Sequence, residues 1–342
     1  MFIKNISIDY ALLLIMSTGK KSFTELGKII EKSSDTVRRL LNPSEKNFEL
    51  LEAVAKEMFK NKKELVLSLD YTLLRKVYAN SMEGVCKFFD TKMGKMINAY
   101  NALIAGLTDG KYFIPIRSGL VFSKEVLSNA NELKNEMVRS IIKETIQKFK
   151  DKMITVAVDG AFATKEFLLW AIENKIRVEV RMHSNRKVLY KGNRIKINEI
   201  TDLQPKGRHM ARTIQVEWHG MMLFITAERR IDKHGEESIV FLASTYHAKP
   251  SQHVNNYKKR WPIEKLNRTS KQTLGLQDCF STKLETQENH LSSVLVAYAI
   301  VQLEMKKLRA LTPEDTIRWF RDKKITSLKQ QFAPLDQIIA SA

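Results

Sequence analysis

Two aspartates stand at the ends of apolar segments that are typical of buried strands. Asp70 closes the segment 64–70, and Asp159 closes the segment 153–159. Adjacent strands of one sheet would bring the two carboxylates together, and a third carboxylate from a helix could complete the site. Carboxylate oxygens are hard ligands that suit Mg²⁺ or Mn²⁺. Two such ions about 4 Å apart can activate a water or a 3′-hydroxyl on one side of a phosphodiester and stabilise the leaving oxygen on the other.

Either aspartate also has a plainer interpretation, because strand-end aspartates often cap turns through backbone hydrogen bonds. Other acidic residues could compete for the role, namely Asp90, Asp109 and Asp151, but none of them closes a comparable apolar strand. The chain contains no Walker-type lysine loop, dinucleotide-binding fingerprint, internal repeat or low-complexity segment. Asp70 and Asp159 are therefore the favoured pair.

A third carboxylate, Glu264, lies in the cation-rich segment 257–271. At about 100° per residue, positions four and seven apart fall close together on a helix. Glu264, Arg268 and Lys271 are thus predicted to share one helix face, on which cations flank the carboxylate. Pro262 suits the first turn of this helix. The alternative is that Glu264 is a surface salt-bridge partner.

The spacing within this segment resembles the YREK signature of insertion-sequence DDE transposases of the cut-and-paste type: Tyr, two residues, Arg, three residues, Glu, six residues, Lys. The matching positions are Tyr257, Arg260, Glu264 and Lys271, and Trp261 and Ile263 also agree with the usual filling. With the two preceding aspartates, the resemblance extends over about residues 63–308.

The resemblance implies roles for these residues. Asp70, Asp159 and Glu264 would be the catalytic carboxylates, holding two Mg²⁺ or Mn²⁺ ions. Tyr257, Arg260 and Lys271 would bind phosphates of the transposon end, and Arg268 on the same helix face is a further expected DNA contact.

Three other positions bear on the resemblance. Trp218 is the best candidate for an aromatic residue that, in some relatives, stacks on a flipped base, although a core position is the alternative. The motif Asp70-Tyr-Thr72 keeps a frequent feature of the family, whereas Gly160 stands where the family often has Arg.

The charge of the chain points to a polyanionic partner. The formal net charge is +19 and the pI is near 9.7. Residues 181–271 hold 19 Lys and Arg against 8 Asp and Glu, a net charge of +11 in about a quarter of the chain. Nucleic acid is the first partner to consider for such a basic stretch. Compositional drift toward lysine is the alternative.

Cysteine and histidine usage does not indicate a metal site. Cys86 and Cys279 lack ligand spacing and suit a reduced, intracellular compartment. His247 and His253 are expected on loops near DNA. The apolar runs 10–16 and 291–303 are shorter than the roughly 20 residues that span a bilayer, and the first lacks a cleavage site. We therefore expect a cytoplasmic protein of bacterial type that associates with the nucleoid.

The first 60 residues are predicted to be helical and to resemble a helix-turn-helix. Segment 23–30 has helical apolar spacing, a polar turn follows at 31–34, and a second helix at 35–41 would be capped by Ser34 or Asp35. Arg38 and Arg39 on the second helix would then contact DNA. A plain helical hairpin fits the same pattern.

The following elements predict an α/β fold with a ribonuclease H-like mixed-sheet core. Strands are expected at 64–70, at 97–107 and 112–122 joined by an Asp-Gly turn, at 153–159 and at 176–182, with helices at 131–150 and 165–174. Later strands are expected at 213–218, 221–228 and 238–245, and later helices at 263–274 and 289–308, with Thr312 capping a last one.

Five parts follow from this order. They are a helical DNA-binding domain (1–60), the first part of the catalytic core (61–182), a basic β-rich insertion (183–250), the second part of the core (251–310) and a helical tail (311–342).

The function implied is cutting of DNA at transposon ends and joining of the 3′-hydroxyls to target DNA. The partners would be double-stranded terminal repeats and target DNA, bound by a homodimer. A catalytically inactive or repurposed transposase that only binds DNA, and a structure-specific nuclease with the same core, are the alternatives.

Overall fold

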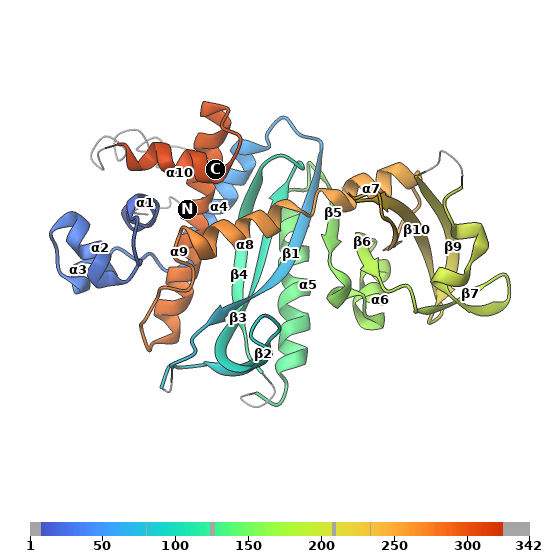
Figure 1. Ribbon diagram of the computed structural model, residues 1–342, viewed down its shortest axis with the longest axis horizontal. Coiled ribbons are helices and arrows are strands. Elements are labelled where there is room, and N and C mark those ends of the chain that lie inside the picture. The colour runs from blue at the N-terminus through green and yellow to red at the C-terminus, as the bar shows by residue number, and fades with distance from the viewer. Residues whose placement is uncertain (1–7, 80, 124–126, 207–209, 233, 324–342) are drawn as a thin grey trace.

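A mixed sheet of eleven strands runs through the computed structural model, which describes residues 8–79, 81–123, 127–206, 210–232 and 234–323 (Figure 1). The strand order is β2-β3-β1-β5-β6-β11-β10-β9-β7-β8, with β4 also paired to β3. The strands are β1 (Glu64–Arg75), β2 (Cys86–Asp90), β3 (Lys95–Thr108), β4 (Phe113–Val121), β5 (Met153–Val158), β6 (Arg177–Met182), β7 (Lys187–Tyr190), β8 (Asn193–Lys196), β9 (Ala211–Trp218), β10 (Met221–Ile231) and β11 (Glu237–Ser244).

The core half of the sheet has the expected order. Strands β1, β5 and β6 are parallel neighbours, and β3 lies antiparallel to β1, β2 and β4. This arrangement is consistent with a ribonuclease H-like transposase core, which confirms the mixed α/β prediction in its coarse form. Strand β2 was not predicted, because its five residues are too few to show a clear period.

The later strands extend the same sheet. Strand β11 pairs antiparallel with β6 from Phe241↔Met182 to Ser244↔Glu179, and β10 and β9 follow. The predicted turn between β9 and β10 is confirmed, since His219 and Gly220 both have positive φ angles, 52° and 79°. Both φ angles are those of a type I′ hairpin turn, which favours Gly at its second position.

Helices cover the core half of the sheet. The helices are α1 (Asp9–Met16), α2 (Phe23–Ile30), α3 (Ser34–Arg38), α4 (Ser44–Met58), α5 (Ala130–Lys148), α6 (Lys165–Glu173), α7 (Pro250–Lys258), α8 (Pro262–Gln272), α9 (Leu284–Leu308) and α10 (Pro313–Arg321). Helices α4 and α9 pack on each other and on β4, while α8 crosses from α9 to β1. Residues Leu291–Val301 are buried, so the apolar run in α9 is a core segment.

The expected cap of α10 is confirmed, since the Thr312 side chain accepts from the N–H of Asp315. Across the described ranges, none of the helices combines the length and apolarity needed to cross a bilayer. Residues 324–342 of the expected C-terminal tail lie outside the described part of the chain.

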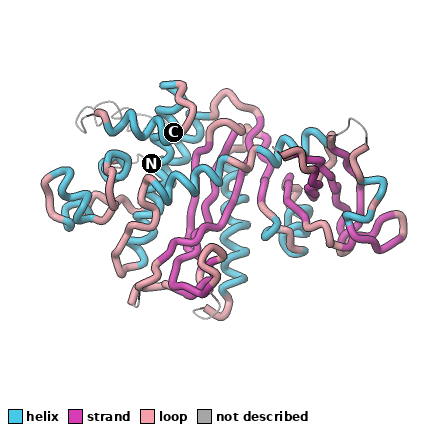
Figure 2. Tube along the Cα trace, viewed as in Figure 1, coloured by secondary structure: helices cyan, strands magenta, loops and turns pink. Residues whose placement is uncertain are grey.

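The N-terminal helices gather at one end of the molecule, away from the strands of the insertion (Figure 2). The predicted cap of α3 is wrong: Ser33, one residue earlier, accepts from the N–H of Thr36, and the helix ends at Arg38. Ser33 takes this role because its backbone is extended, as an N-cap requires. Arg38, at the end of this short helix, and Arg39, its C-cap, are both exposed. Its binding to DNA stays a prediction.

Candidate active site

Asp70 and Asp159 lie at the same edge of two neighbouring parallel strands. The expectation that Asp70 ends its strand is wrong, because β1 continues to Arg75 in its pairing with β3. The parallel pairing of β1 with β5, however, ends at Leu69↔Val158. Asp70 directly follows Leu69, and Asp159 directly follows Val158. The register of the two strands therefore places the two carboxylates side by side.

The carboxylate of Asp70 is partly buried and only partly supplied with donors. Its Oδ1 accepts from the N–H of Tyr71 at 3.0 Å, and its Oδ2 accepts from Nδ2 of Asn267 at 3.0 Å. The pKa of Asp70 is raised to about 6, chiefly by burial; the Arg260 guanidinium acts to lower this pKa, and the carboxylates of Asp159 and Glu264 act to raise it. Asp70 therefore interacts electrostatically with both of the other predicted carboxylates.

Asp159 also fulfils the turn-capping interpretation. Its Oδ1 accepts from the N–H of Ala161 at 2.9 Å and so caps the 3₁₀ turn Gly160–Phe162. A Cβ at position 160 would lie 3.3 Å from the backbone oxygen of Arg181. The backbone of Arg181 thus leaves little room for a side chain, which suits Gly160. The family that this chain resembles often has Arg at this position.

Glu264 enters the site from α8. Its carboxylate pairs with Arg260, whose side chain is 12% exposed, against 35% for Glu264. The Arg260 guanidinium lies 5.8 Å from the ring centre of Tyr257, a buried residue of α7. Helix α7 was not predicted, because its sequence is polar and Pro250 stands at its start. Three of the four YREK positions thus form one contact chain.

Two open grooves meet at Glu264. The first, which we call the core groove, has a volume of about 940 Å³; the second, the insertion groove, has about 720 Å³. Both are rich in cations. The core groove is lined by Asp70, Arg75, Lys92, Glu264, Arg268 and Lys271 among others, and the insertion groove by Arg181, Arg229, Arg230, Tyr257, Lys258, Arg260 and Glu264 among others.

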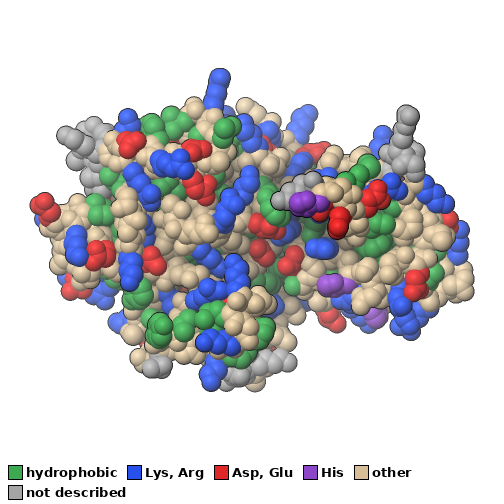
Figure 3. Space-filling view, in the orientation of Figure 1, with side chains coloured by type: hydrophobic (Ala, Val, Ile, Leu, Met, Phe, Trp, Pro, Cys, Tyr) green, Lys and Arg blue, Asp and Glu red, His purple; other side chains and the backbone are tan. Residues whose placement is uncertain are grey.

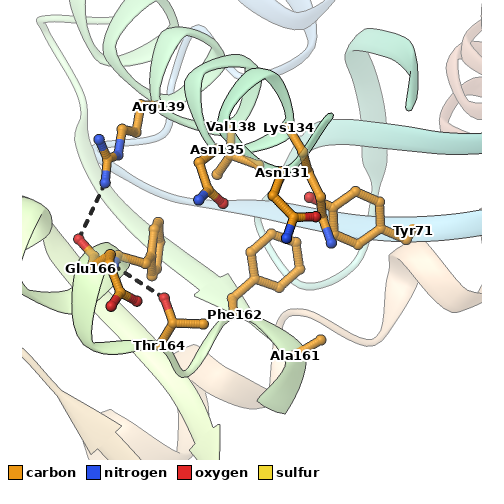
Figure 4. Close-up of a pocket in the computed structure, with 11 residues that line it drawn as sticks. Tyr71, Asn131, Lys134, Asn135, Val138, Arg139, Ala161, Phe162, Thr164 and Glu166 are labelled. Atoms are coloured by element: carbon orange, nitrogen blue, oxygen red, sulfur yellow. Dashed lines mark hydrogen bonds between the residues drawn. The ribbon is translucent and has the colours of Figure 1, made fainter. Parts of the chain in front are cut away.

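A smaller pocket of about 290 Å³ is lined by Tyr71, which follows Asp70 in the sequence, and by Ala161 and Phe162, which come shortly after Asp159 (Figure 4). The ring of Tyr71 stacks on that of Phe162, with centres 5.2 Å apart and planes 9° apart. Lys134 Nζ lies 4.2 Å from the centre of the Tyr71 ring. Burial lowers the pKa of Lys134 and the nearby Asp159 raises it. Sequence analysis missed Lys134 because it is one of many cations on the amphipathic helix α5.

The remaining predicted residues divide into three groups. Arg268 and Lys271 line the core groove with Glu264. Arg38, the last residue of α3, and Arg39, its C-cap, line neither groove. Trp218 is buried, 3% exposed, with Arg186 over its ring at 5.5 Å, so the structure places it in the core rather than where a base could stack.

Two histidines were expected on loops, and the structure confirms this for one of them only. His247 is exposed on a loop, as predicted. The prediction for His253 is wrong: it lies on α7, is 0% exposed and contacts Glu179 through Nδ1 at 2.7 Å. Its apolar neighbours on the helix and its carboxylate partner on β6 account for the burial.

The donor set at the sheet edge fits a hard divalent cation. In the ranges that the structure describes, no three Asp, Glu, His or Cys side chains form a ready ligand cluster. Asp70, Asp159 and Glu264 instead bond to Asn267, Ala161 and Arg260. Asn267 Oδ1 is buried without a described partner, and the raised pKa of Asp70 reflects burial and repulsion that a cation would relieve.

Comparison with protein families bears on the same residues. A profile of the transposase DDE domain matches residues 113–300, more than half of the chain. The matched range includes Asp159 and Glu264, and Asp70 precedes it. A search of curated proteins finds no match. The fold, the paired aspartates and this match agree, and the chain belongs to the family of transposases with a DDE domain.

Proposed function

We propose that this transposase cuts DNA at transposon ends and joins the freed 3′-hydroxyls to target DNA by two-metal phosphoryl transfer. The observation that carries the proposal is the strand register: the parallel pairing ends at Leu69↔Val158, so Asp70 and Asp159 are adjacent. Glu264 adds a third carboxylate that acts on Asp70 through space. Such a set of oxygen ligands is what metal-dependent phosphoryl transfer requires.

The roles of the residues follow from their surroundings. Asp70, Asp159 and Glu264 would hold two Mg²⁺ or Mn²⁺ ions. When bound, the ions would supply an activated oxygen nucleophile and neutralise charge at the phosphate. Arg260 pairs with Glu264 and lines the insertion groove with it, and its guanidinium can bind a DNA phosphate there with two hydrogen bonds. The ring of Tyr257 packs against the Arg260 guanidinium and helps to position it.

DNA would follow the two grooves that meet at Glu264. Figure 3 shows Lys and Arg side chains on both sides of the acidic side chains near the centre of this face. Arg268 and Lys271 would contact the backbone in the core groove, and the basic stretch 181–271 would do so in the insertion groove. Arg38 and Arg39, at the C-terminal end of α3, would contact the transposon end outside both grooves. Joining two ends needs two active sites, so we propose a homodimer assembled on DNA.

Glu264→Gln separates catalysis from binding. Glutamine keeps the shape and helix propensity of glutamate but removes the charge that a divalent cation needs. On a labelled duplex carrying the terminal repeat of the encoding element, we expect Mg²⁺-dependent cleavage to fall by about a thousandfold or more, with binding affinity in EDTA retained. Asp70→Asn and Asp159→Asn should behave alike, and their combination should cost little more, because residues of one site act as a unit.

Glu285→Gln, at an exposed position of α9, is the matched control and should cleave normally. Wild-type cleavage by the Glu264→Gln protein would overturn the assignment of the site. A wild-type protein that binds the duplex but never cleaves it with Mg²⁺ or Mn²⁺ would instead be a DNA-binding protein without catalysis.

A further inference from the structure

The hairpin formed by β2 and β3 exposes an unusual group of apolar side chains. Phe89 and Met96 face each other across the two strands, and they are 59% and 51% exposed. Met93, in the turn, is 40% exposed. Figure 3 shows green apolar side chains and blue cationic side chains next to one another in the region of this hairpin. Large apolar side chains grouped on a surface in this way mark a binding surface.

The turn of the hairpin is held in a fixed shape. Arg75 on β1 donates to both oxygens of Asp90, at 2.5 and 3.1 Å. Asp90 also accepts from the backbone N–H groups of Lys92 and Met93, at 2.9 and 3.2 Å. Asp90 thus fixes the backbone of Lys92. The side chain of Lys92 is exposed and lines the core groove together with Phe89.

The core groove at this point has more positive than negative charge. Lys271 of α8 lines the groove together with Lys92 of the hairpin. Burial lowers the pKa of Lys271, the nearby charges of Lys92 and Arg75 also act to lower it, and the carboxylates of Asp70 and Asp90 act to raise it. Asp90, the only acidic residue between positions 86 and 99, is already bonded to Arg75. These cations would be stabilised by an anion between them.

We propose that the β2–β3 hairpin is a DNA-binding element of the core groove. Lys92 and Lys271 bind phosphates of one DNA strand from the two walls of the groove, and the exposed ring of Phe89 packs on a base or sugar of the same strand. The inference rests on the proposed function, since Asp70 and Glu264 line the same groove. A strand held here leads directly to the carboxylates.

DNA suits this surface better than a second copy of the chain. A protein interface over Phe89, Met93 and Met96 would bury the neighbouring cations Lys92 and Lys271, and burying unpaired charges is costly. The chain itself carries a net charge of +19, so two copies would repel each other here. A DNA strand supplies anions in its phosphates and apolar surface in its sugars and in any base that is not stacked on its neighbours.

The test compares three single variants by titrating a fluorescein-labelled 30-base-pair duplex in EDTA over a range of salt concentrations. Lys92→Ala should flatten the salt dependence by about one counterion, since one phosphate contact is lost. Phe89→Ala should weaken binding about tenfold with an unchanged salt slope. The matched control is Lys95→Ala, which removes the same charge from the same hairpin but does not line the groove. It should leave the slope as it is.

Equal slopes for Lys92→Ala and wild type, or equal changes for Lys92→Ala and Lys95→Ala, would overturn the inference. It would also fall if Phe89→Ala kept wild-type affinity for DNA but abolished a dimer that forms without DNA in sedimentation. In both cases Mg²⁺-dependent cleavage that Glu264→Gln abolishes would leave the proposed function standing. A wild-type protein that fails to bind the duplex at any salt concentration would overturn both.

Discussion

Glu179 on β6 and Asp70 on β1, the strands on either side of β5, are acidic residues with very different surroundings. Glu179 on β6 is 0% exposed and accepts hydrogen bonds from Ser244, from Tyr246 at 2.5 Å and from His253 at 2.7 Å. Asp70 on β1 has one backbone and one amide donor, together with two carboxylate neighbours that raise its pKa. Glu179 thus has three donors, whereas Asp70 has two donors and lies near two further carboxylates.

The difference follows from the cost of burying charge. An ion in the interior must be paired and fully hydrogen-bonded to be tolerated. The cluster around Glu179 meets this condition and thereby ties β6, β11 and α7 together. His253 and Tyr257 are one helical turn apart on α7, so the cluster also fixes the approach to Arg260. Around Asp70, the Arg260 guanidinium pairs with Glu264 and opposes the charges of three carboxylates, and a bound cation would balance the excess negative charge.

The largest effect on stability should come from breaking the Glu179 cluster. Glu179→Ala leaves Ser244, Tyr246 and His253 without their acceptor, and removing one partner of a buried pair typically costs about 3–5 kcal/mol. Urea unfolding followed by circular dichroism measures the loss. Glu173→Ala, at an exposed position of α6, is the control and should stay within about 0.5 kcal/mol of wild type. A loss below about 1 kcal/mol for Glu179→Ala would mean that the cluster does not hold the fold together.

Asp70→Asn should have the opposite effect on stability, and the effect should be smaller than that of Glu179→Ala. The pKa of Asp70 in the fold is about 6, above its ordinary value of 3.8. Folding therefore favours the protonated form, and the wild type loses stability as the pH rises from about 4 to 6. Without divalent metal, the variant should be more stable than wild type by on the order of 2 kcal/mol above pH 6 and no more stable below pH 4.

Thermal unfolding across this pH range, with and without Mg²⁺, checks the prediction. At pH 7.5, millimolar Mg²⁺ should raise the melting temperature of the wild type and not that of Asp70→Asn, because only the wild type binds the ion. A pH-independent difference between the two proteins would show that Asp70 is not strained by burial.

The residues of the proposed active site could be singled out from the sequence, whereas those of the Glu179 cluster could not. Spacing within one helix is set by covalent geometry, so the shared face of Glu264, Arg268 and Lys271 could be predicted from the sequence. The aspartates follow apolar strands, whose pattern is local. The partners Glu179 and His253 are 74 residues apart and meet only through the register of β11 on β6. No local pattern encodes that register.

Other departures have similar causes. The sequence predicted that β1 would end at Asp70, because the apolar run stops there, but pairing with β3 carries the strand on. Trp218 is buried by the strands of the insertion and by Arg186, contacts that depend on tertiary packing. The β2–β3 hairpin was missed because β2, with five residues, is too short to show a clear period.

The smallest expected effects come from removing a single donor at each carboxylate. Tyr246→Phe removes one of the donors to Glu179, and the net worth of one such hydrogen bond is about 1 kcal/mol, or somewhat more to a charged acceptor. Asn267→Ala removes the amide that holds Asp70 and should cost stability to a similar degree.

The two variants should differ in function. Tyr246→Phe should leave the Mg²⁺ dependence of cleavage unchanged, because Glu179 stays buried among its other partners. Asn267→Ala should shift that dependence, because Asp70 loses the donor that orients it beside Asp159, and orienting partners of metal ligands typically matter about 10- to 100-fold in metal affinity. Titrating cleavage with Mg²⁺ gives both answers in one assay. Equal shifts for the two variants would contradict the distinction between a carboxylate that holds the fold and one that binds the metal.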